Sequence, residues 1–425
     1  MNTVKPATPA SAGTLSVDLR HVVYALSDAL DLVGIDDVGH GKRVGIMAAA
    51  CARAMGLDAT EATFLFDLGM LHDIGVSSTE THRHLVAEFD WDSSQVHCEV
   101  GFELLRDFAP LAAMARPIRH HHTHWAQLTG RADIGPRDAL RANLIYLVDR
   151  VDALAAPHYA DRSLLMHTAR IRDMIAGRRD VFFAPKLVDG FLEASAQEAF
   201  WLQLEPRGIQ AAMQEMLDAH APHAATLDEL RQLAAIFSRI VDAKSPFTAS
   251  HSLGVARLSR FIAERMGVPR ENCDRLEIAG LLHDLGKLRI PDEILDKPGP
   301  LDERERKVIN AHSFETWQIL RHVRGLEEIT LWASNHHEEP DGSGYPFHRR
   351  NLELPLEARI LRVADIFQAM VQDRPYRRGL SAGQVLAFMR DLVACGRVEA
   401  QIVEVLAQAM PDAMAAAKPA PAFPP

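Results

Sequence analysis

Hydrophobic residues recur every three or four positions along most of the chain. Two clear examples are VDLRHVVYALSDALDLV, close to the N-terminus, and LDELRQLAAIFSRIVDA, just past the middle. This spacing places apolar side chains on one face of a helix. The strict alternation of apolar and polar residues that is typical of half-buried strands is scarce. The sequence therefore predicts an all-α protein built from helical bundles.

Three stretches lack this periodicity. Residues 1–16 are rich in Ala, Thr, Ser and Pro, and residues 413–425 read AMAAAKPAPAFPP, so we expect both tails to be disordered. Residues 206–225 contain the breaks PRG and HAPHAA and are predicted to form a linker. The chain is long enough for two domains of ordinary size, which we place at residues 17–205 and 226–412.

The two predicted domains contain the same series of His and Asp residues. In the first domain the series is His40, His72, Asp73, His97, His121, His122 and Asp149. In the second domain it is His251, His283, Asp284, His312, His336, His337 and Asp365. In both domains the first histidine precedes the His-Asp pair by 32 residues, and the next histidine precedes the His-His pair by 24 residues. The flanking residues agree as well, since LGMLHDIG matches AGLLHDLG. The chain is therefore predicted to be a tandem duplication.

This series favours a metal centre over a set of structural histidines. A single His-Asp pair is more often a structural contact, but an ordered set of seven donors is not explained in that way. Neighbours on a helix point about 100° apart, so His283 and Asp284 suit a carboxylate that bridges two ions better than two terminal ligands of one ion. Seven donors spread over five helices predict a dinuclear centre in a helical bundle. Two such ions could hold a bridging hydroxide and neutralise a phosphodiester under attack. Nitrogen and oxygen donors without thiolate favour iron, manganese or nickel, and then zinc, over copper(I) or an iron–sulfur cluster.

Further motifs surround this series in the second domain. They are LLHDLGK, IPDEILDKPGPL, HHEEPDGSGYP, PLEARILRVADIF and DRPYR. Together they resemble the HD-GYP domain, a subgroup of the HD phosphohydrolase superfamily, over about Leu227 to Pro411. The resemblance implies hydrolysis of cyclic di-GMP to linear pGpG, and in some members onward to GMP, by a metal-bridging hydroxide.

The resemblance also implies roles for individual residues. One metal is held by His251, His283, Asp284 and Asp365, and Asp284 bridges to a second held by His312, His336 and His337. Asp284 helps to orient the hydroxide, and Lys287 places its ammonium on the scissile phosphate to stabilise charge in the transition state. Phe247 stands where some relatives carry a carboxylate for a third metal, so we expect two metals.

Substrate contacts are implied at four further positions. Gly344 and Tyr345 lie where the family contacts a guanine or a phosphate, and Arg374 and Arg377 match its phosphate-binding pair. The alternatives are structural, because Tyr345 could only pack the loop and Arg377 could be a solvated charge at a helix start.

The first domain resembles a plain HD domain over roughly Val17 to Leu204. Its seven donors are complete and could form a second metal site. Val76 occupies the place of Lys287, however, and RHHHTHWAQLTGRADIG replaces the GYP loop. This domain could be a second phosphohydrolase, a metal sensor, a ligand-binding regulator or a decayed docking surface. We favour regulation or assistance over independent catalysis.

Charge and composition limit the possible partners. The net charge of −11 argues against broad binding of nucleic-acid polymers. The sequence shows neither a signal peptide nor an apolar run of about 20 residues, so we expect a cytoplasmic protein without membrane contact. The partners we expect are a cyclic dinucleotide substrate, a GGDEF-domain cyclase, which the resemblance implies, and a second copy of the chain.

Two rival functions stand beside cyclic di-GMP hydrolysis. One is a phosphodiesterase that prefers 3′,3′-cyclic GMP-AMP, which the additional N-terminal HD domain makes a live alternative. The other is a non-catalytic signalling scaffold, because some related HD domains have lost their metals and act by contact. The intact donor series and Lys287 count against the scaffold.

Overall fold

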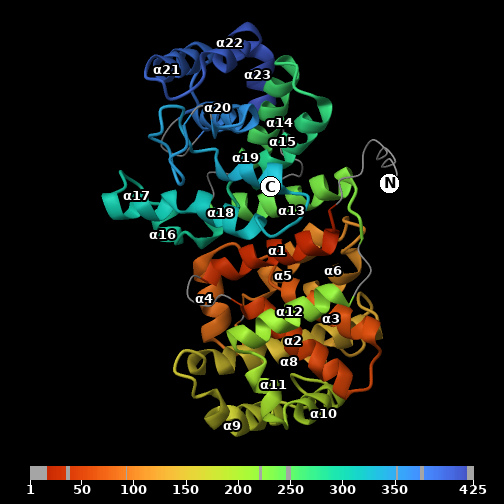
Figure 1. Cartoon of the computed structure of the whole chain (residues 1–425). Helices are drawn as coiled ribbons and strands as arrows, with labels where there is room; N and C mark the ends of the chain where they lie inside the picture. The colour runs from red at the N-terminus through yellow and green to blue at the C-terminus, as the bar shows by residue number, and fades with distance from the viewer. Residues whose placement is uncertain are drawn as a thin grey trace, which may run out of the picture.

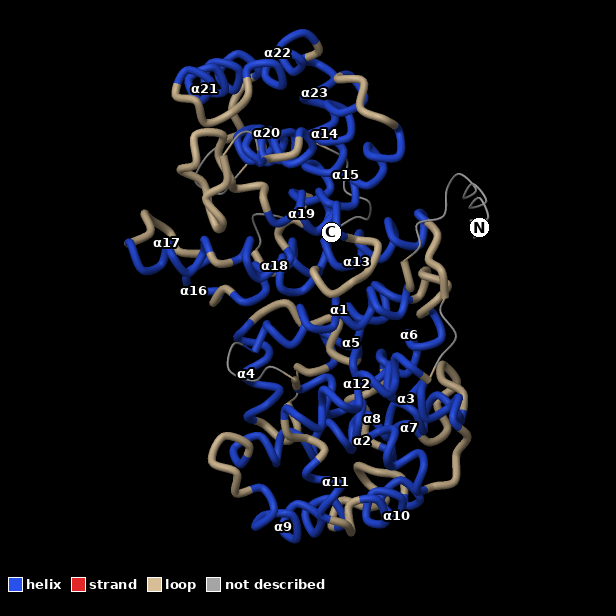
Figure 2. The backbone as a smooth tube through the Cα atoms, viewed as in Figure 1, coloured by secondary structure: helices blue, strands red, loops and turns tan. Residues whose placement is uncertain are grey.

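The computed structural model describes residues 17–34, 39–91, 93–219, 223–245, 250–350, 353–373 and 378–418. The predicted tail at residues 1–16 lies outside these ranges, as do Phe247, Arg374 and Arg377. The described residues form helices joined by loops, without any strand (Figure 2), and this confirms the predicted all-α fold.

The molecule consists of two stacked groups of helices (Figure 1). The N-terminal half, residues 17–219, occupies the lower part of the view, and the C-terminal half, residues 223–418, the upper part. Helices α1 and α13, the first helix of each half, lie at the junction.

The helices of the N-terminal half are α1 (Leu19–Asp31), η1 (Leu32–Gly34), α2 (His40–Ala54), α3 (Ala59–Leu71), α4 (Thr79–Ala87), α5 (Gln95–Leu105), α6 (Ala112–Arg119), α7 (Trp125–Leu128), α8 (Pro136–Ala155), η2 (Ala156–His158), α9 (Leu164–Ala176), α10 (Pro185–Ala194), α11 (Glu198–Leu202) and α12 (Pro206–Asp218). Those of the C-terminal half are α13 (Leu227–Ala243), α14 (His251–Arg265), α15 (Arg270–Leu282), η3 (Leu285–Arg289), α16 (Asp292–Leu295), α17 (Glu303–Asn310), α18 (His312–Leu320), α19 (Glu327–Ser334), α20 (Leu356–Val371), α21 (Ala382–Ala394), α22 (Ala400–Gln408) and α23 (Met410–Ala417).

Helix α13 illustrates how the sequence sets these elements. The N–H of Glu229 donates to Thr226 Oγ1 at 3.1 Å, and the N–H of Thr226 donates to Glu229 Oε2 at 2.8 Å. This reciprocal cap satisfies two backbone donors that the first turn leaves unpaired. The apolar face then buries side chains at helical spacing, namely Leu230, Leu233, Ala234, Phe237, Ile240 and Val241.

Glycine brings the central helices of each half close together. A Cβ atom on Gly69 of α3 would lie 2.6 Å from the Cα atom of Gly45 in α2. In the C-terminal half, a Cβ atom on Gly280 of α15 would lie 2.7 Å from the Cα atom of Ala256 in α14. Only a residue without a side chain fits at these crossings. The close approach brings the start of α2 or α14 beside the end of α3 or α15, where the first donors of each series lie.

Two segments differ from the sequence-based prediction. Most of the predicted linker, residues 206–225, forms helix α12, whose Ile209 is buried. The chain is also helical beyond residue 413, where the predicted disordered tail begins, because α23 extends to Ala417 and buries Ala413 and Ala417. Residues 419–425 of that tail lie outside the described ranges.

The two halves meet through helices and through a polar cluster. Helix α1 packs against α18 and η3, and η1 packs against η3. Nearby, Lys244 Nζ donates to Asp292 Oδ1 at 2.9 Å, and the N–H of Thr79 donates to Asp292 Oδ2 at 2.8 Å. The fully buried ammonium of Lys244 is therefore linked to the N-terminal half through the shared carboxylate and also directly, because it donates to Ser77 O at 3.4 Å and to Thr79 Oγ1 at 3.3 Å. Among the described helices, none combines the length and the apolar character needed to cross a membrane.

Candidate metal centres

Five helices of the C-terminal half bring its donor series together. His251 begins α14, His283 and Asp284 follow α15, His312 begins α18, the His-His pair follows α19, and Asp365 lies in α20. Their ligand atoms form three overlapping groups in which every atom lies within 4.8 Å of the others. The groups are His251, His283 and Asp365; His283, Asp284 and His336; and His312, His336 and His337. The structure thus brings all seven predicted metal ligands of this half to one place.

The carboxylate of Asp284 lies between two sets of imidazoles. Its Oδ2 atom is 3.3 Å from His283 Nε2 and 3.4 Å from His251 Nε2. Its Oδ1 atom is 3.4 Å from His312 Nε2 and 3.8 Å from His336 Nε2. One oxygen faces each set, which is the arrangement needed for a carboxylate that bridges two ions.

The outer ring nitrogens fix the direction of the imidazoles. Nδ1–H groups donate to backbone carbonyls three residues earlier, at 2.8 Å from His283 to Gly280, 2.7 Å from His312 to Ile309 and 2.6 Å from His336 to Ala333. These bonds leave each Nε2 atom unprotonated, with a lone pair that points inward and can bind a metal ion. His251 uses a side chain instead, because its Nδ1 donates to Gln368 Oε1 at 2.6 Å.

The cluster fits a metal better than it fits a hydrogen-bond network. Within the described residues, the buried atoms His283 Nε2 and Asp284 Oδ1 have no hydrogen-bond partner. Buried polar atoms are rarely left unpaired, and a bound ion would satisfy both. Burial lowers the pKa of His312 to about 4, so this ring is in the neutral form that a ligand needs. Although burial lowers the pKa of His251, Asp284 and Asp365 raise it to about 10, so the cluster attracts positive charge.

Lys287 lies at the edge of this cluster. Helix η3 holds it three residues after Asp284, and its ammonium donates to Asp284 Oδ2 at 2.5 Å. About a fifth of its side chain is exposed. The cation is thus already beside the carboxylate before any ligand binds.

The glycine-rich loop after α19 borders the same cluster. The ring of Tyr345 stacks on the ring of His337 at 4.8 Å between centroids, and the backbone N–H of Tyr345 donates to the backbone oxygen of His337 at 3.2 Å. A Cβ atom on Gly344 would lie 2.2 Å from the backbone nitrogen of Glu339, so this position requires glycine. The structure places both predicted substrate contacts next to the predicted metal ligands. Arg374 and Arg377 cannot be compared because they lie outside the described residues.

Sequence reasoning missed the residues that hold this loop. Glu339 Oε1 accepts from Arg362 Nη2 at 2.6 Å, and Glu339 Oε2 accepts from Arg397 Nε at 2.6 Å and from Ser343 Oγ at 2.9 Å. The pairs join residues that are 23 and 58 positions apart in the chain, and no local signal in the sequence reveals them. Gln368 could have been found, because it lies three residues after Asp365 on α20 and so on the same face.

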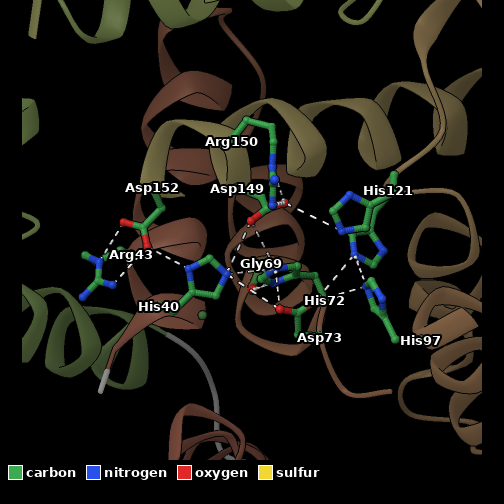
Figure 3. Close-up of polar contacts among 12 residues, drawn as sticks. His40, Arg43, Gly69, His72, Asp73, His97, His121, Asp149, Arg150 and Asp152 are labelled. Carbon is green, nitrogen blue, oxygen red and sulfur yellow. Dashed lines mark hydrogen bonds and ion pairs between the residues drawn. The ribbon is translucent and has the colours of Figure 1, made fainter. Parts of the chain in front are cut away.

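The N-terminal half repeats the arrangement around Asp73 (Figure 3). The Oδ1 atom of Asp73 is 3.3 Å from His97 Nε2 and 3.7 Å from His121 Nε2. Its Oδ2 atom is 3.5 Å from His72 Nε2 and 3.8 Å from His40 Nε2. His40, His72 and Asp73 form one group of ligand atoms, and Asp73, His97, His121 and His122 form another.

Asp149 completes the N-terminal series, but it is partnered differently from Asp365. Its Oδ1 atom is 3.5 Å from His40 Nε2, and its Oδ2 atom accepts from Arg150 Nη2 at 2.9 Å (Figure 3). The residue that follows Asp365 is Ile366, which carries no charge. Both oxygens of Asp149 therefore face imidazoles, because Oδ2 is also 3.8 Å from His122 Nε2, but Oδ2 in addition neutralises a buried arginine.

The outer partner of His40 also differs from that of His251. His40 Nδ1 lies 2.7 Å from Asp152 Oδ2, where the C-terminal half has the amide of Gln368. Arg43 and Tyr159 donate to Asp152 Oδ1 at 2.7 and 2.6 Å. Val76 is buried at the position of Lys287.

Comparisons with known proteins agree with this geometry. A family model described as an HD domain matches residues 235–402. The chain is 38% identical to 3'3'-cGAMP-specific phosphodiesterase 1 of Vibrio cholerae, over 92% of this chain and 91% of that protein. It is 34% identical to the cyclic di-GMP phosphodiesterase response regulator RpfG of Xanthomonas campestris, over 37% of this chain and 43% of that protein. A crystal structure of a cyclic GMP-AMP-specific phosphodiesterase of V. cholerae (V-cGAP3) is similar, with a TM-score of 0.60 and 26% identity, over 94% of this chain and 98% of that one.

Proposed function

The chain belongs to the HD-GYP family of cyclic dinucleotide phosphodiesterases, and we propose that its C-terminal centre hydrolyses 3′,3′-cyclic GMP-AMP. The observation that carries this proposal is the carboxylate of Asp284, which faces two sets of imidazoles and has the ammonium of Lys287 2.5 Å away. Relatives that match both halves support the mixed dinucleotide as the substrate, because their names specify cyclic GMP-AMP.

The donor series assigns ligands to two ions. His251, His283, Asp284 and Asp365 would hold one, and Asp284, His312, His336 and His337 would hold the other. Two bound ions would activate water for in-line attack and neutralise the phosphodiester. For their identity we propose iron, manganese, nickel or zinc rather than copper(I) or an iron–sulfur cluster, because the donors are nitrogen and oxygen without thiolate. The outer hydrogen bonds of the imidazoles keep each Nε2 aimed inward, so little reorganisation is needed on binding.

Lys287 supplies a fixed positive charge beside the reacting phosphate. Its ammonium is held in place by Asp284 and is largely screened from solvent. A charge that is positioned in advance, in a site that excludes water, stabilises the extra negative charge of the transition state more than that of the substrate. Tyr345 adds an aromatic face at the rim, against which a base can stack.

Cyclic di-GMP is the second candidate substrate. The resemblance of the GYP motif and the match to a named cyclic di-GMP phosphodiesterase favour it. That match covers 37% of the chain, whereas the relative named for cyclic GMP-AMP matches over 92%. We therefore rank the mixed dinucleotide first, which reverses the order that the motifs alone suggest. The GGDEF-domain partner and the homodimer stay predictions.

The test of this assignment is hydrolysis of 3′,3′-cyclic GMP-AMP by the full chain loaded with Mn²⁺, followed by chromatography of the products. We expect a linear dinucleotide that appears with the metal-loaded protein and not after chelation. Intact substrate after prolonged incubation, with bound metal confirmed by elemental analysis, would contradict the proposal and favour the signalling scaffold.

A further inference from the structure

We propose that the N-terminal half carries a second metal centre, which binds divalent transition-metal ions through His40, His72, Asp73, His97, His121, His122 and Asp149 and does not hydrolyse cyclic dinucleotides. This centre goes beyond the function proposed above, which needs only the donors of the C-terminal half.

Facing nitrogen atoms are the first evidence for bound ions. His40 Nε2 and His72 Nε2 are 3.3 Å apart, and His97 Nε2 and His121 Nε2 are 3.2 Å apart. Two nitrogens bound to one ion at about 2.1 Å are separated by roughly 3–3.4 Å. Each pair therefore has the separation of two ligands of a common ion.

The outer hydrogen bonds show which nitrogens carry lone pairs. His72 Nδ1 donates to Gly69 O at 2.7 Å, and His121 Nδ1 donates to Ile118 O at 2.6 Å. The Nε2 atoms of both rings then carry lone pairs that point at another imidazole. In addition, the buried Oδ1 atom of Asp73 has no hydrogen-bond partner among the described residues. Two cations, one at each facing pair of histidines and both beside Asp73, would satisfy all of these atoms.

The partner of His40 argues against a decayed site. A carboxylate on the outer nitrogen of a ligating histidine raises the basicity of the ring and holds its orientation. Asp152 provides this contact at 2.7 Å and is itself held by Arg43 and Tyr159. The C-terminal half has only an amide there, in Gln368. The N-terminal half thus strengthens a ligand rather than losing it.

The same half lacks what the hydrolysis needs. Val76 stands in place of the lysine, so the charge beside the bridging carboxylate is missing. The cavity that adjoins His40, His72 and Asp73 has a volume of about 20 Å³, which is enough for about one water molecule. Sites for ligands of drug size measure roughly 300–1,000 Å³. A larger cavity of about 470 Å³ between the halves reaches His97 but is lined by none of the other six donors.

The segment after Asp73 connects this centre to the other half. The chain runs from Val76 to Thr79, whose N–H donates to Asp292 at 2.8 Å. Asp292 also accepts from Lys244 and follows η3 by three residues. Ions bound at Asp73 would hold the segment from Val76 to Thr79 in place. This segment contacts Asp292, which follows the helix that carries Lys287, so the second centre is structurally connected to the C-terminal site.

The experiment counts metal in the full chain with Mn²⁺ as the probe. Two matched variants each lose one facing pair of histidines: His97→Gln with His121→Gln, and His312→Gln with His336→Gln. After removal of free metal, elemental analysis should find less metal than in the wild type for each variant, by roughly one to two ions per chain. The C-terminal variant should retain metal and cleave neither 3′,3′-cyclic GMP-AMP nor cyclic di-GMP.

Several outcomes would overturn the proposal. They are a C-terminal variant that binds no metal although circular dichroism shows it folded, an N-terminal variant with wild-type metal content, and hydrolysis by the C-terminal variant. A second measurement needs no mutation: the ligand-field absorbance of Co²⁺ should saturate near four equivalents per wild-type chain, and saturation at about two would contradict the second centre. Because metal counting uses no substrate, its failure is distinct from failure of the proposed hydrolysis.

Discussion

The ammonium of Lys287 donates to Asp284 Oδ2 at 2.5 Å, on the carboxylate that faces both sets of imidazoles. In the N-terminal half, the matching carboxylate Asp73 has the same two-sided position, but Val76 replaces the lysine. The two halves thus share the donors and differ in the charge beside them. From this difference we propose that hydrolysis takes place in the C-terminal half.

Replacing Lys287 by Ala should retain the metal and slow hydrolysis. Loss of one preorganised group that stabilises transition-state charge costs roughly 10²–10³-fold in kcat. The measurement is kcat with metal content determined on the same preparation. Lys307→Ala, which removes an exposed lysine of α17, is the matched control and should behave as wild type. An unchanged kcat in Lys287→Ala would mean that this lysine is structural.

Asp284→Ala should remove both metal positions of the C-terminal centre together. One carboxylate faces both sets of imidazoles, so its loss affects both ions rather than one. We expect hydrolysis to fall to background and metal content to fall by roughly two ions per chain. Asp228→Ala removes an exposed carboxylate and serves as the control. Turnover like that of the wild type would contradict a bridging role for Asp284.

Gly344→Ala should damage substrate binding without loss of metal. The added Cβ atom would lie 2.2 Å from the nitrogen of Glu339, so the loop that carries Tyr345 must move. Displacement of a binding element by such overpacking should lower kcat/KM roughly tenfold, with the effect mainly in KM. Gly299→Ala, where no neighbour lies within 4 Å of the new atom, is the matched change. Equal kinetic constants in the two variants would show that this loop does not contribute to substrate binding.

Asp292→Ala should destabilise the junction of the halves. The variant leaves the buried ammonium of Lys244 without its carboxylate, at a cost of about 3 kcal/mol. Urea unfolding of the metal-free protein measures this loss. Glu303→Ala breaks an exposed ion pair with Lys307 and should cost less than about 1 kcal/mol. Similar midpoints for the two variants would show that the polar cluster does not stabilise the junction.

The same pair predicts a dependence on pH. Burial opposes ionisation of Asp292, but the hydrogen bond and charge of Lys244 outweigh it and lower the pKa of the carboxyl below its usual value of 3.8. The carboxylate therefore stabilises the folded state fully above about pH 4, and this contribution declines as the pH falls further. The difference in stability between wild type and Asp292→Ala should shrink below about pH 4. A difference that stays constant down to pH 3 would contradict this account.

The repeat in the sequence was enough to predict which His and Asp residues lie together. Two equal intervals, of 32 and 24 residues, and similar flanking residues in both halves indicated fourteen candidate positions, and the structure brings each set of seven together around its aspartate. Helix crossings at Gly69 and Gly280 explain why such distant positions meet. Amino-acid composition was less reliable for predicting which segments are helical and which are not. The motif PRG predicted a break at Pro206, although proline is favoured in the first turn of a helix, and Pro206 begins α12 here.

Partners that depend on tertiary packing could not be predicted in the same way. Glu339 contacts Arg362 of α20 and Arg397, which lies between α21 and α22, only because tertiary packing brings these segments together. Arg150 could equally point to solvent from its position in the sequence, and only the packing of α8 turns it onto Asp149. These contacts distinguish the surroundings of the two donor series, although the series themselves are alike.

The most direct measurement is kcat/KM of the Mn²⁺-loaded full chain for 3′,3′-cyclic GMP-AMP and for cyclic di-GMP, made side by side with wild type and Lys287→Ala. We expect the wild type to prefer the mixed dinucleotide and the variant to lose activity on both substrates. Faster cleavage of cyclic di-GMP would contradict the proposed preference for 3′,3′-cyclic GMP-AMP. If the metal-loaded protein cleaved neither dinucleotide, the proposal that hydrolysis takes place at Asp284 would be contradicted.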